Sequence, residues 1–122
     1  MIQRTIYLEA LKTWRDKQVI KVVTGVRRCG KSTLFQQYIN LLLTNGVQQE
    51  NIIYINLEDL GFERLLDYRE LYTYIAERLS TSANTYVFLD EVQQCKNFEK
   101  AVDSLYLREN VDIYITGSNA NL

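Results

Sequence analysis

Residues 25–32 are the part of this chain whose residue types and spacing point most directly to chemistry. They read Gly-Val-Arg-Arg-Cys-Gly-Lys-Ser, which fits the pattern G-x-x-x-x-G-K-[ST] at every fixed position. In such a loop the glycines allow a tight turn, so that successive backbone N–H groups point inward around a phosphate. A helix that begins at the loop adds the partial positive charge of its N-terminus. The pattern predicts a loop that binds nucleotide phosphates.

The ligands expected for this loop are ATP and Mg²⁺. Lys31 is expected to reach the β- and γ-phosphates and to act in catalysis, while the Ser32 hydroxyl is expected to ligate Mg²⁺. GTP is disfavoured because the chain contains no Asn-Lys-x-Asp motif that would read guanine. The residues expected to bind the nucleotide are Gly25, Val26, Arg27, Arg28, Cys29, Gly30, Lys31, Ser32 and Thr33.

Two adjacent carboxylates, Asp90 and Glu91, follow an apolar run. Ligands of open α/β sheets bind at the carboxyl ends of the strands, so these acids are expected at a ligand site. Asp90 is expected to hold Mg²⁺, mainly through water, and Glu91 to polarise the attacking water as general base. Glu58 follows another apolar run and is the alternative base. We favour Glu91, because the strand before Glu58 is expected to lie farther from the phosphates.

A cluster of small polar residues follows the last apolar run. A neutral donor at this point could sense the γ-phosphate or position the water, and the candidates are, in order, Asn119, Ser118 and Thr116. Asn119 and Ser118 are therefore expected to take part in catalysis. The alternative is a plain Gly-Ser-Asn turn, which these residue types also favour.

The spacing of apolar residues predicts the elements that would carry these groups. Four short, β-branched runs predict strands buried on both faces, as parallel strands are, at residues 19–24, 52–56, 86–90 and 111–116. Helical spacing predicts helices between them, and another over about residues 7–14. Strands alternating with helices in this way indicate an α/β sandwich with a parallel sheet.

Helix ends are also predicted from residue type. Gly46 lies where a glycine would end the helix whose apolar stripe covers residues 34–42. Asp67 and Glu70 have the spacing of a capping box at the start of the next helix, and Asn97 is placed to cap the last one.

Composition excludes several classes of protein. The chain has 122 residues, no histidine and two cysteines, which excludes a His/Cys zinc site, a Ser-His-Asp or Cys-His hydrolase and a disulfide framework within it. Its net charge of −1 gives no overall electrostatic footprint for nucleic acid. It contains no apolar stretch long enough for a membrane span. We expect a cytoplasmic protein with no membrane partner.

Residues 25–32, the Leu89-Asp90-Glu91 run and residues 115–119, in this order and spacing, resemble the AAA+-type P-loop ATPases. The likeness extends from about Tyr7 to Asn119. It is greatest to a prokaryotic subgroup of predicted ATPases with Arg-Arg in the phosphate loop and Thr-Gly-Ser after the fourth strand.

The resemblance implies a three-layer P-loop NTPase sandwich with a sheet order of 5-1-4-3-2. It also implies that residues 1–122 form a nucleotide-binding core that stops before the fifth strand and the lid. The expected order within the chain is therefore 1-4-3-2, with the first strand as a bare edge. An arginine finger would lie outside the chain, and the resemblance leaves a homo-oligomer through the missing region open.

The leading functional hypothesis is an ATPase that hydrolyses the β–γ phosphoanhydride bond with Mg²⁺ to drive a conformational switch or motor. Hydrolysis by this fragment alone is expected to be weak. A P-loop kinase is the alternative enzyme, and a non-hydrolysing, nucleotide-dependent interaction module is the alternative outside catalysis. The Asp90-Glu91 pair favours water as the acceptor.

Overall fold

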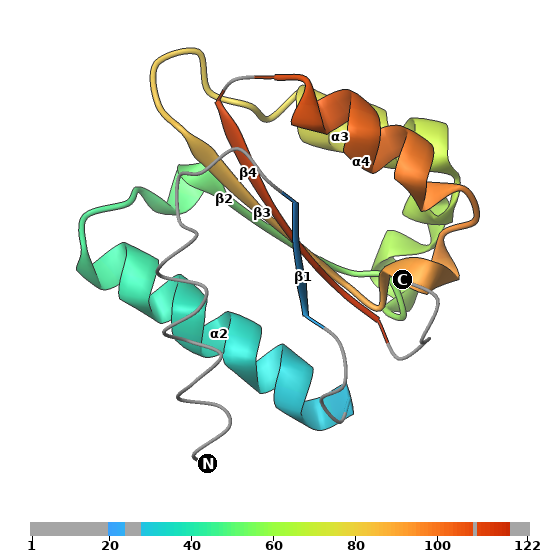
Figure 1. The fold of residues 1–122 in the computed structure, drawn as a ribbon, viewed down its shortest axis with the longest axis horizontal. Helices are drawn as coiled ribbons and strands as arrows, with labels where there is room; N and C mark the ends of the chain where they lie inside the picture. The colour runs from blue at the N-terminus through green and yellow to red at the C-terminus, as the bar shows by residue number, and fades with distance from the viewer. Residues whose placement is uncertain (1–19, 24–27, 109, 118–122) are drawn as a thin grey trace.

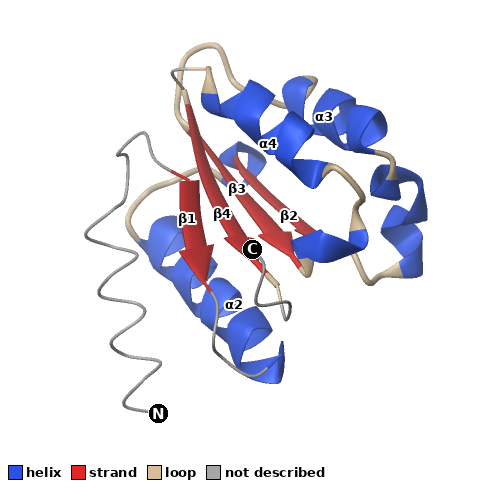
Figure 2. Cartoon of the chain, turned by 45° about the vertical axis from the view of Figure 1, so that its right-hand side comes forward, coloured by secondary structure: helices blue, strands red, loops and turns tan. Residues whose placement is uncertain are grey.

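A parallel sheet of four strands forms the middle of the protein. The computed structural model describes residues 20–23, 28–108 and 110–117, with side chains from Leu34 onward. The strands are β1 (Ile20–Val23), β2 (Ile52–Asn56), β3 (Thr85–Asp90) and β4 (Val111–Thr116), in the order β1-β4-β3-β2. Every neighbouring pair is parallel, so all four arrowheads in Figure 2 point to one edge of the sheet. The predicted α/β class with a parallel sheet is confirmed.

Helices cover the two faces of this sheet unequally (Figure 1). One face is covered by α2 (Arg28–Thr44), and the other by α3 (Tyr68–Ala76) and α4 (Phe98–Tyr106). Three short 3₁₀ segments that the spacing did not predict connect the elements: η1 (Gln49–Asn51), η2 (Leu60–Leu66) and η3 (Val92–Gln94). The helix predicted over residues 7–14 lies outside the described residues.

Aromatic side chains fix α2 on the sheet. Phe35 and Tyr38, one helical turn apart, are fully buried and both contact Phe88 of β3 edge-on. Phe88 in turn stacks on Tyr114 of β4, with ring centroids 4.7 Å apart. Such ring pairs stabilise by about 0.5 to 1.5 kcal/mol each beyond the burial of their area. They hold the helix that follows the predicted phosphate loop in a defined position.

Gly46 ends this helical segment as predicted. It has φ of 98°, a conformation that glycine adopts without steric cost. Its N–H bonds to the carbonyl of Leu43, and the N–H of Val47 bonds to the carbonyl of Leu42. This pair of bonds is a Schellman motif, and it satisfies carbonyl groups that the helix end leaves without intrahelical partners.

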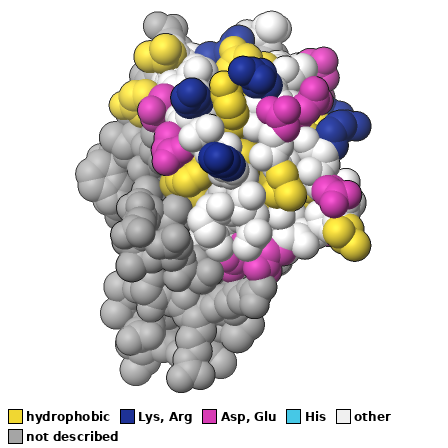
Figure 3. Space-filling model, turned by 90° about the vertical axis from the view of Figure 1, so that its right-hand side faces the viewer, with side chains coloured by type: hydrophobic (Ala, Val, Ile, Leu, Met, Phe, Trp, Pro, Cys, Tyr) yellow, Lys and Arg dark blue, Asp and Glu magenta, His cyan; other side chains and the backbone are white. Residues whose placement is uncertain are grey.

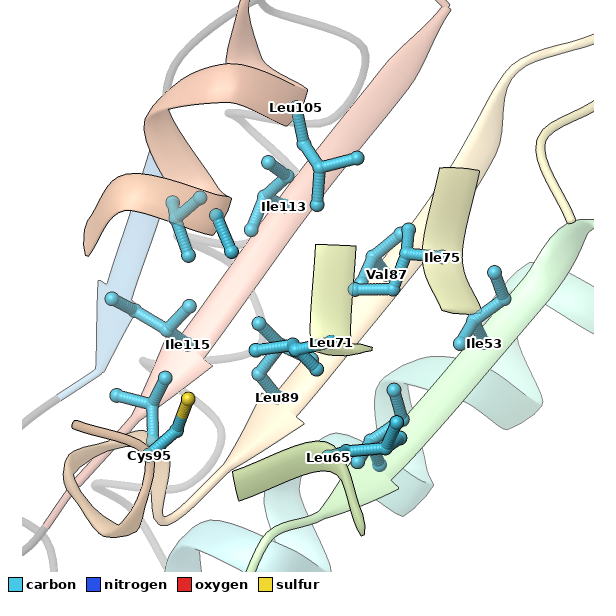
Figure 4. Close-up of a cluster of buried hydrophobic side chains, with 14 of the residues drawn as sticks. Ile53, Leu65, Leu71, Ile75, Val87, Leu89, Cys95, Leu105, Ile113 and Ile115 are labelled. Atoms are coloured by element: carbon cyan, nitrogen blue, oxygen red, sulfur yellow. The ribbon is translucent and has the colours of Figure 1, made fainter. Parts of the chain in front are cut away.

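The opposite face of the sheet packs an aliphatic core against α3 and α4 (Figure 4). Leu71 and Ile75 of α3 and Leu105 of α4 are fully buried there. The strands contribute alternate residues to the same cluster: Ile53, Ile55, Val87, Leu89, Val111, Ile113 and Ile115.

The expectation that every strand is buried on both faces is wrong for β2. All six residues of β3 and of β4 are buried, whereas burial alternates along β2 because it is the outermost strand. Ile53 and Ile55 point into the aliphatic core, while Ile52, Tyr54 and Asn56 are only half-buried on the α2 side.

The predicted cap residues lie at the starts of α3 and α4, but not all of the predicted capping hydrogen bonds form. Asp67 caps α3 by accepting from the N–H of Arg69, but its own N–H bonds to the carbonyl of Arg64. The capping box therefore does not close, and Glu70 lies 3.8 Å from the Arg64 guanidinium instead. Asn97 precedes α4 but makes no side-chain cap, because its φ of 63° is left-handed rather than extended.

Candidate functional site

The described backbone of the phosphate-loop motif lies at the edge of the sheet where the strands end. β1 ends at Val23 and α2 begins at Arg28, so the motif has the strand–loop–helix context that it requires. Figure 1 shows α2 starting beside the arrowhead of β1. Gly25, Val26 and Arg27 lie outside the described residues. For Arg28, Cys29, Gly30, Lys31, Ser32 and Thr33 the structure gives the backbone, as the first turns of α2.

Asp90 lies at this same edge and on the face that α2 covers. It is the last residue of β3 and follows Phe88 by two positions, so both side chains are on the α2 side of the sheet. The carboxylate is fully buried. Its Oδ2 accepts a hydrogen bond from the Tyr54 hydroxyl at 2.8 Å, and its Oδ1 accepts one from the Thr116 hydroxyl at 2.5 Å. Asp90 is therefore held by side chains from both neighbouring strands.

Glu91 follows in an unusual backbone conformation. Its φ of 54° and ψ of 51° are left-handed, a region that costs a residue with a side chain about 1 to 2 kcal/mol. Non-glycine residues held in this way cluster at functional sites. The side chain is 2% exposed, and its Oε1 accepts from the Gln93 amide at 2.8 Å. The turn at Glu91 ends the strand and fixes the side chain next to Asp90.

Thr116 links these two acids. Its hydroxyl donates to Asp90, and its oxygen accepts the backbone N–H of Glu91 at 3.3 Å. The hydroxyl proton is thus used within the cluster, which argues against the predicted contact from Thr116 to a γ-phosphate. Ser118 and Asn119 lie outside the described residues, so their predicted roles stay predictions.

Glu58, the alternative base, is not buried as Asp90 and Glu91 are. It is exposed in the turn after β2, where its backbone N–H donates to the Asn56 side chain at 3.0 Å. Two residues of the cluster were not singled out in the sequence, Tyr54 and Gln93. The contact of Tyr54 with Asp90 depends on the register between β2 and β3, which the sequence does not give. The contact of Gln93 with Glu91 depends on the left-handed turn at Glu91.

The donor set at this edge suits Mg²⁺ better than a metal held entirely by protein. Among the described residues no three His, Cys, Asp or Glu side chains gather as a metal site. Mg²⁺ is usually bound by one or two carboxylates together with waters and substrate phosphates. Asp90, with a predicted serine hydroxyl and phosphates opposite, would supply such a set.

The outer face of α3 and α4 carries charges of both signs (Figure 3). Basic side chains there lie against tyrosine rings, with the Arg78 guanidinium 3.6 Å from the centre of the Tyr74 ring. Acidic side chains are interspersed among them, so this face has no field of one sign to attract a polyanion. Of the helices in the described part of the chain, none could cross a membrane, given their length and apolar content.

Sequence comparison finds relatives of this chain in Haemophilus influenzae and Methanocaldococcus jannaschii. The chain is 41% identical over its full length to an uncharacterized protein of Haemophilus influenzae, of which it covers 31%. It is 37% identical over 105 residues to an uncharacterized protein of Methanocaldococcus jannaschii, of which it covers 22%. The chain thus spans a third or less of the length of these relatives.

A family model described as an AAA domain matches residues 17–122, which include the phosphate-loop motif and all the strands of the described residues. The family match indicates a nucleotide-binding, ATPase-like domain. The chain belongs to the AAA domain family.

Proposed function

We propose that this protein binds Mg-ATP at the strand-end edge of the sheet and hydrolyses its β–γ phosphoanhydride bond. One observation carries the proposal: Asp90 and Glu91 are both buried at the end of β3, and Asp90 lies on the side covered by the helix that begins at the phosphate-loop motif. A buried carboxylate needs hydrogen bonds or a positive charge to compensate its lost hydration, and two adjacent ones at the end of a parallel strand support a cation-binding site there.

Each residue has a stated task in this proposal. Lys31 contacts the β- and γ-phosphates, and Ser32 and Asp90 hold Mg²⁺, the latter through water. The metal, when bound, would neutralise charge on the phosphates. Glu91 accepts the proton of the attacking water as general base. Ser118 and Asn119 would contact the γ-phosphate from the end of β4.

The larger context is also proposed. Residues 1–122 would form the core of a longer ATPase in which a lid and an arginine finger are supplied from elsewhere, since the relatives are at least three times as long. Hydrolysis would then drive a conformational switch or motor. An arginine finger contributes about 10³ to 10⁵ in rate in other NTPases, so residues 1–122 alone are expected to bind ATP and to turn it over slowly.

The test compares two variants in the full-length protein. Glu91→Gln is expected to keep ATP affinity within about twofold and to lower phosphate release by about 100-fold or more, because the general base is lost. Glu58→Gln, which neutralises the exposed acid after β2, is the matched control and should keep the wild-type rate. Equal loss in both variants, or none in either, would remove Glu91 as the base.

Binding and reaction type are tested separately. Lys31→Ala is expected to weaken ATP binding by about tenfold or more in calorimetry, because a charge-assisted phosphate contact is lost. Unchanged affinity would contradict the phosphate-loop assignment. Release of free phosphate equal to the ADP formed supports hydrolysis, whereas ADP formed without phosphate in the presence of an acceptor would indicate a kinase. Tight binding with no product would indicate a non-hydrolysing module.

A further inference from the structure

Tyr54 extends from the outermost strand to the buried carboxylate of Asp90. In the register between β2 and β3, Tyr54 lies opposite Phe88, two residues before Asp90. A long side chain can reach such a diagonal neighbour on the adjacent strand. The Tyr54 hydroxyl does so, donating to Oδ2 of Asp90 at 2.8 Å. The ring itself packs at the margin of the aromatic cluster under α2.

The Tyr54 hydroxyl is one of two side-chain donors that bond to the Asp90 carboxylate from neighbouring strands. Thr116 donates to the other carboxylate oxygen from the strand on the opposite side of β3. With one donor on each oxygen, the plane of the carboxylate is fixed. Each oxygen of an ionised carboxylate has two acceptor positions, so these two hydroxyls do not by themselves occupy all of them.

From this geometry we infer that Tyr54 is a positioning residue for the divalent cation, acting through Asp90. The inference rests on the proposed Mg-ATP site. Hydrogen bonds to an ionised acceptor are stronger than those between neutral groups, and they hold the acceptor in one orientation. A metal ligand is effective only in a narrow range of orientations, so the groups that orient Asp90 also affect the metal that it binds. Removing the Tyr54 hydroxyl therefore reduces the gain in ATP affinity that Mg²⁺ provides. The ATP affinity in the absence of Mg²⁺, which depends on the phosphate loop, stays unchanged.

The experiment measures ATP affinity of the protein by calorimetry in excess Mg²⁺ and in EDTA. Tyr54→Phe retains the ring and removes the hydroxyl. Its affinity in EDTA is expected to equal that of the wild type within about twofold, and the gain in affinity on adding Mg²⁺ to be about fivefold to tenfold smaller. Mn²⁺ binding to the protein–nucleotide complex, followed by electron paramagnetic resonance, should weaken by a similar factor.

Tyr72→Phe is the matched control. It removes a tyrosine hydroxyl that accepts a hydrogen bond from Arg108 at 2.9 Å on α3, on the other side of the sheet. It should leave both affinities unchanged. Thr116→Val, which removes the second donor to Asp90, should act in the same direction as Tyr54→Phe.

Two results would overturn the inference. A Tyr54→Phe protein with the wild-type Mg²⁺ dependence would show that the bond does not position the metal ligand. Equal weakening in EDTA and in Mg²⁺ would assign Tyr54 a structural role only. Both results presuppose a wild type whose affinity rises with Mg²⁺. A wild type with no ATP binding or no metal effect would instead contradict the proposed function and the inference together.

Discussion

The two faces of the sheet are built from different chemistry. The face under α3 and α4 is lined by a cluster of buried Ile, Leu, Val, Ala and Cys side chains. The face under α2 is lined by aromatic rings, and at the strand ends by hydrogen-bonded polar groups around Asp90. The first face supplies apolar packing, whereas the second combines packing with the candidate site.

Strand β3 makes this difference sharpest, because its successive side chains alternate between the faces. Leu89 points into the aliphatic core, and Asp90, the next residue, points to the α2 side. Changes in neighbouring residues of one strand should therefore have separable effects on folding and on nucleotide binding.

The largest expected effect is on the aliphatic face. Leu89→Ala removes a fully buried side chain and should lower the free energy of unfolding by about 2 to 5 kcal/mol through lost burial and a cavity. ATP affinity of the folded fraction should remain within about twofold. Urea unfolding and calorimetry at low temperature measure the two quantities. Leu107→Ala, at a residue 80% exposed, is the control and should change stability by less than about 0.5 kcal/mol. Lost affinity at wild-type stability would contradict the separation of the faces.

A pH effect on the same face comes next. Burial, and to a lesser degree the nearby Asp67 and Glu99, raise the pKa of the Cys95 thiol from 9.0 to about 11. The folded state therefore holds this proton more tightly than the unfolded state does. The resulting stability is present below pH 9 and is lost as the pH rises from 9 through 11, by up to about 2 to 3 kcal/mol.

Cys95→Ala isolates this contribution from the titration of lysines and tyrosines. The free energy of unfolding, measured between pH 8 and 11, should fall less steeply in the variant than in the wild type. Parallel curves would mean that the thiol is not protected by its surroundings in the folded state.

A smaller change on the α2 face should affect both stability and binding. Phe88→Leu removes the stacking on Tyr114 and the edge contact with Phe35, and should cost about 1 to 2 kcal/mol. Because Phe35 belongs to the helix that follows the phosphate loop, we expect ATP affinity to fall as well, by about twofold to fivefold. Val87→Ala, on the opposite face of the same strand, should destabilise without changing affinity. Equal effects of both variants on ATP affinity would contradict the claim that only the α2 face affects nucleotide binding.

The smallest effect should arise at the end of α2, away from both cores. A methyl group at Gly46 would meet no atom within 4 Å, so the cost of Gly46→Ala comes from its φ of 98° alone. We expect a loss of about 1 kcal/mol in urea unfolding, and less for Gly46→Asn, because asparagine tolerates left-handed conformations better. An alanine variant as stable as the wild type would mean that the helix end adapts without cost.

Most of the local structure follows from short-range patterns in the sequence. The period of two in the strands and of 3.6 in the helices predicts the elements, because each pattern reports which side of an element is apolar. Gly46 and Asp67 mark helix ends through interactions with residues at most a few positions away. The phosphate-loop motif and the Asp90-Glu91 pair are likewise contiguous in sequence.

Misjudged features depend on what surrounds a residue. The half-buried face of β2 results from its place at the end of the sheet order, which its apolar run does not reveal. Glu70 had the spacing to close a capping box, but the backbone N–H of Asp67, which would have to donate to it, donates to the Arg64 carbonyl instead. Asn97 had the residue type for a cap, but not the backbone conformation.

By itself, the sequence determined that strands alternate with helices, that a phosphate-loop motif lies between the first strand and the next helix, and that two acids follow an apolar strand. Only the tertiary structure decided that Tyr54 and Thr116, 62 positions apart in the chain, donate to the two oxygens of Asp90. The reason is physical: hydrogen bonds between strands depend on which strands are neighbours and in what register. A side-chain pattern within one strand specifies its buried face, but not the polar atom that the next strand brings to it.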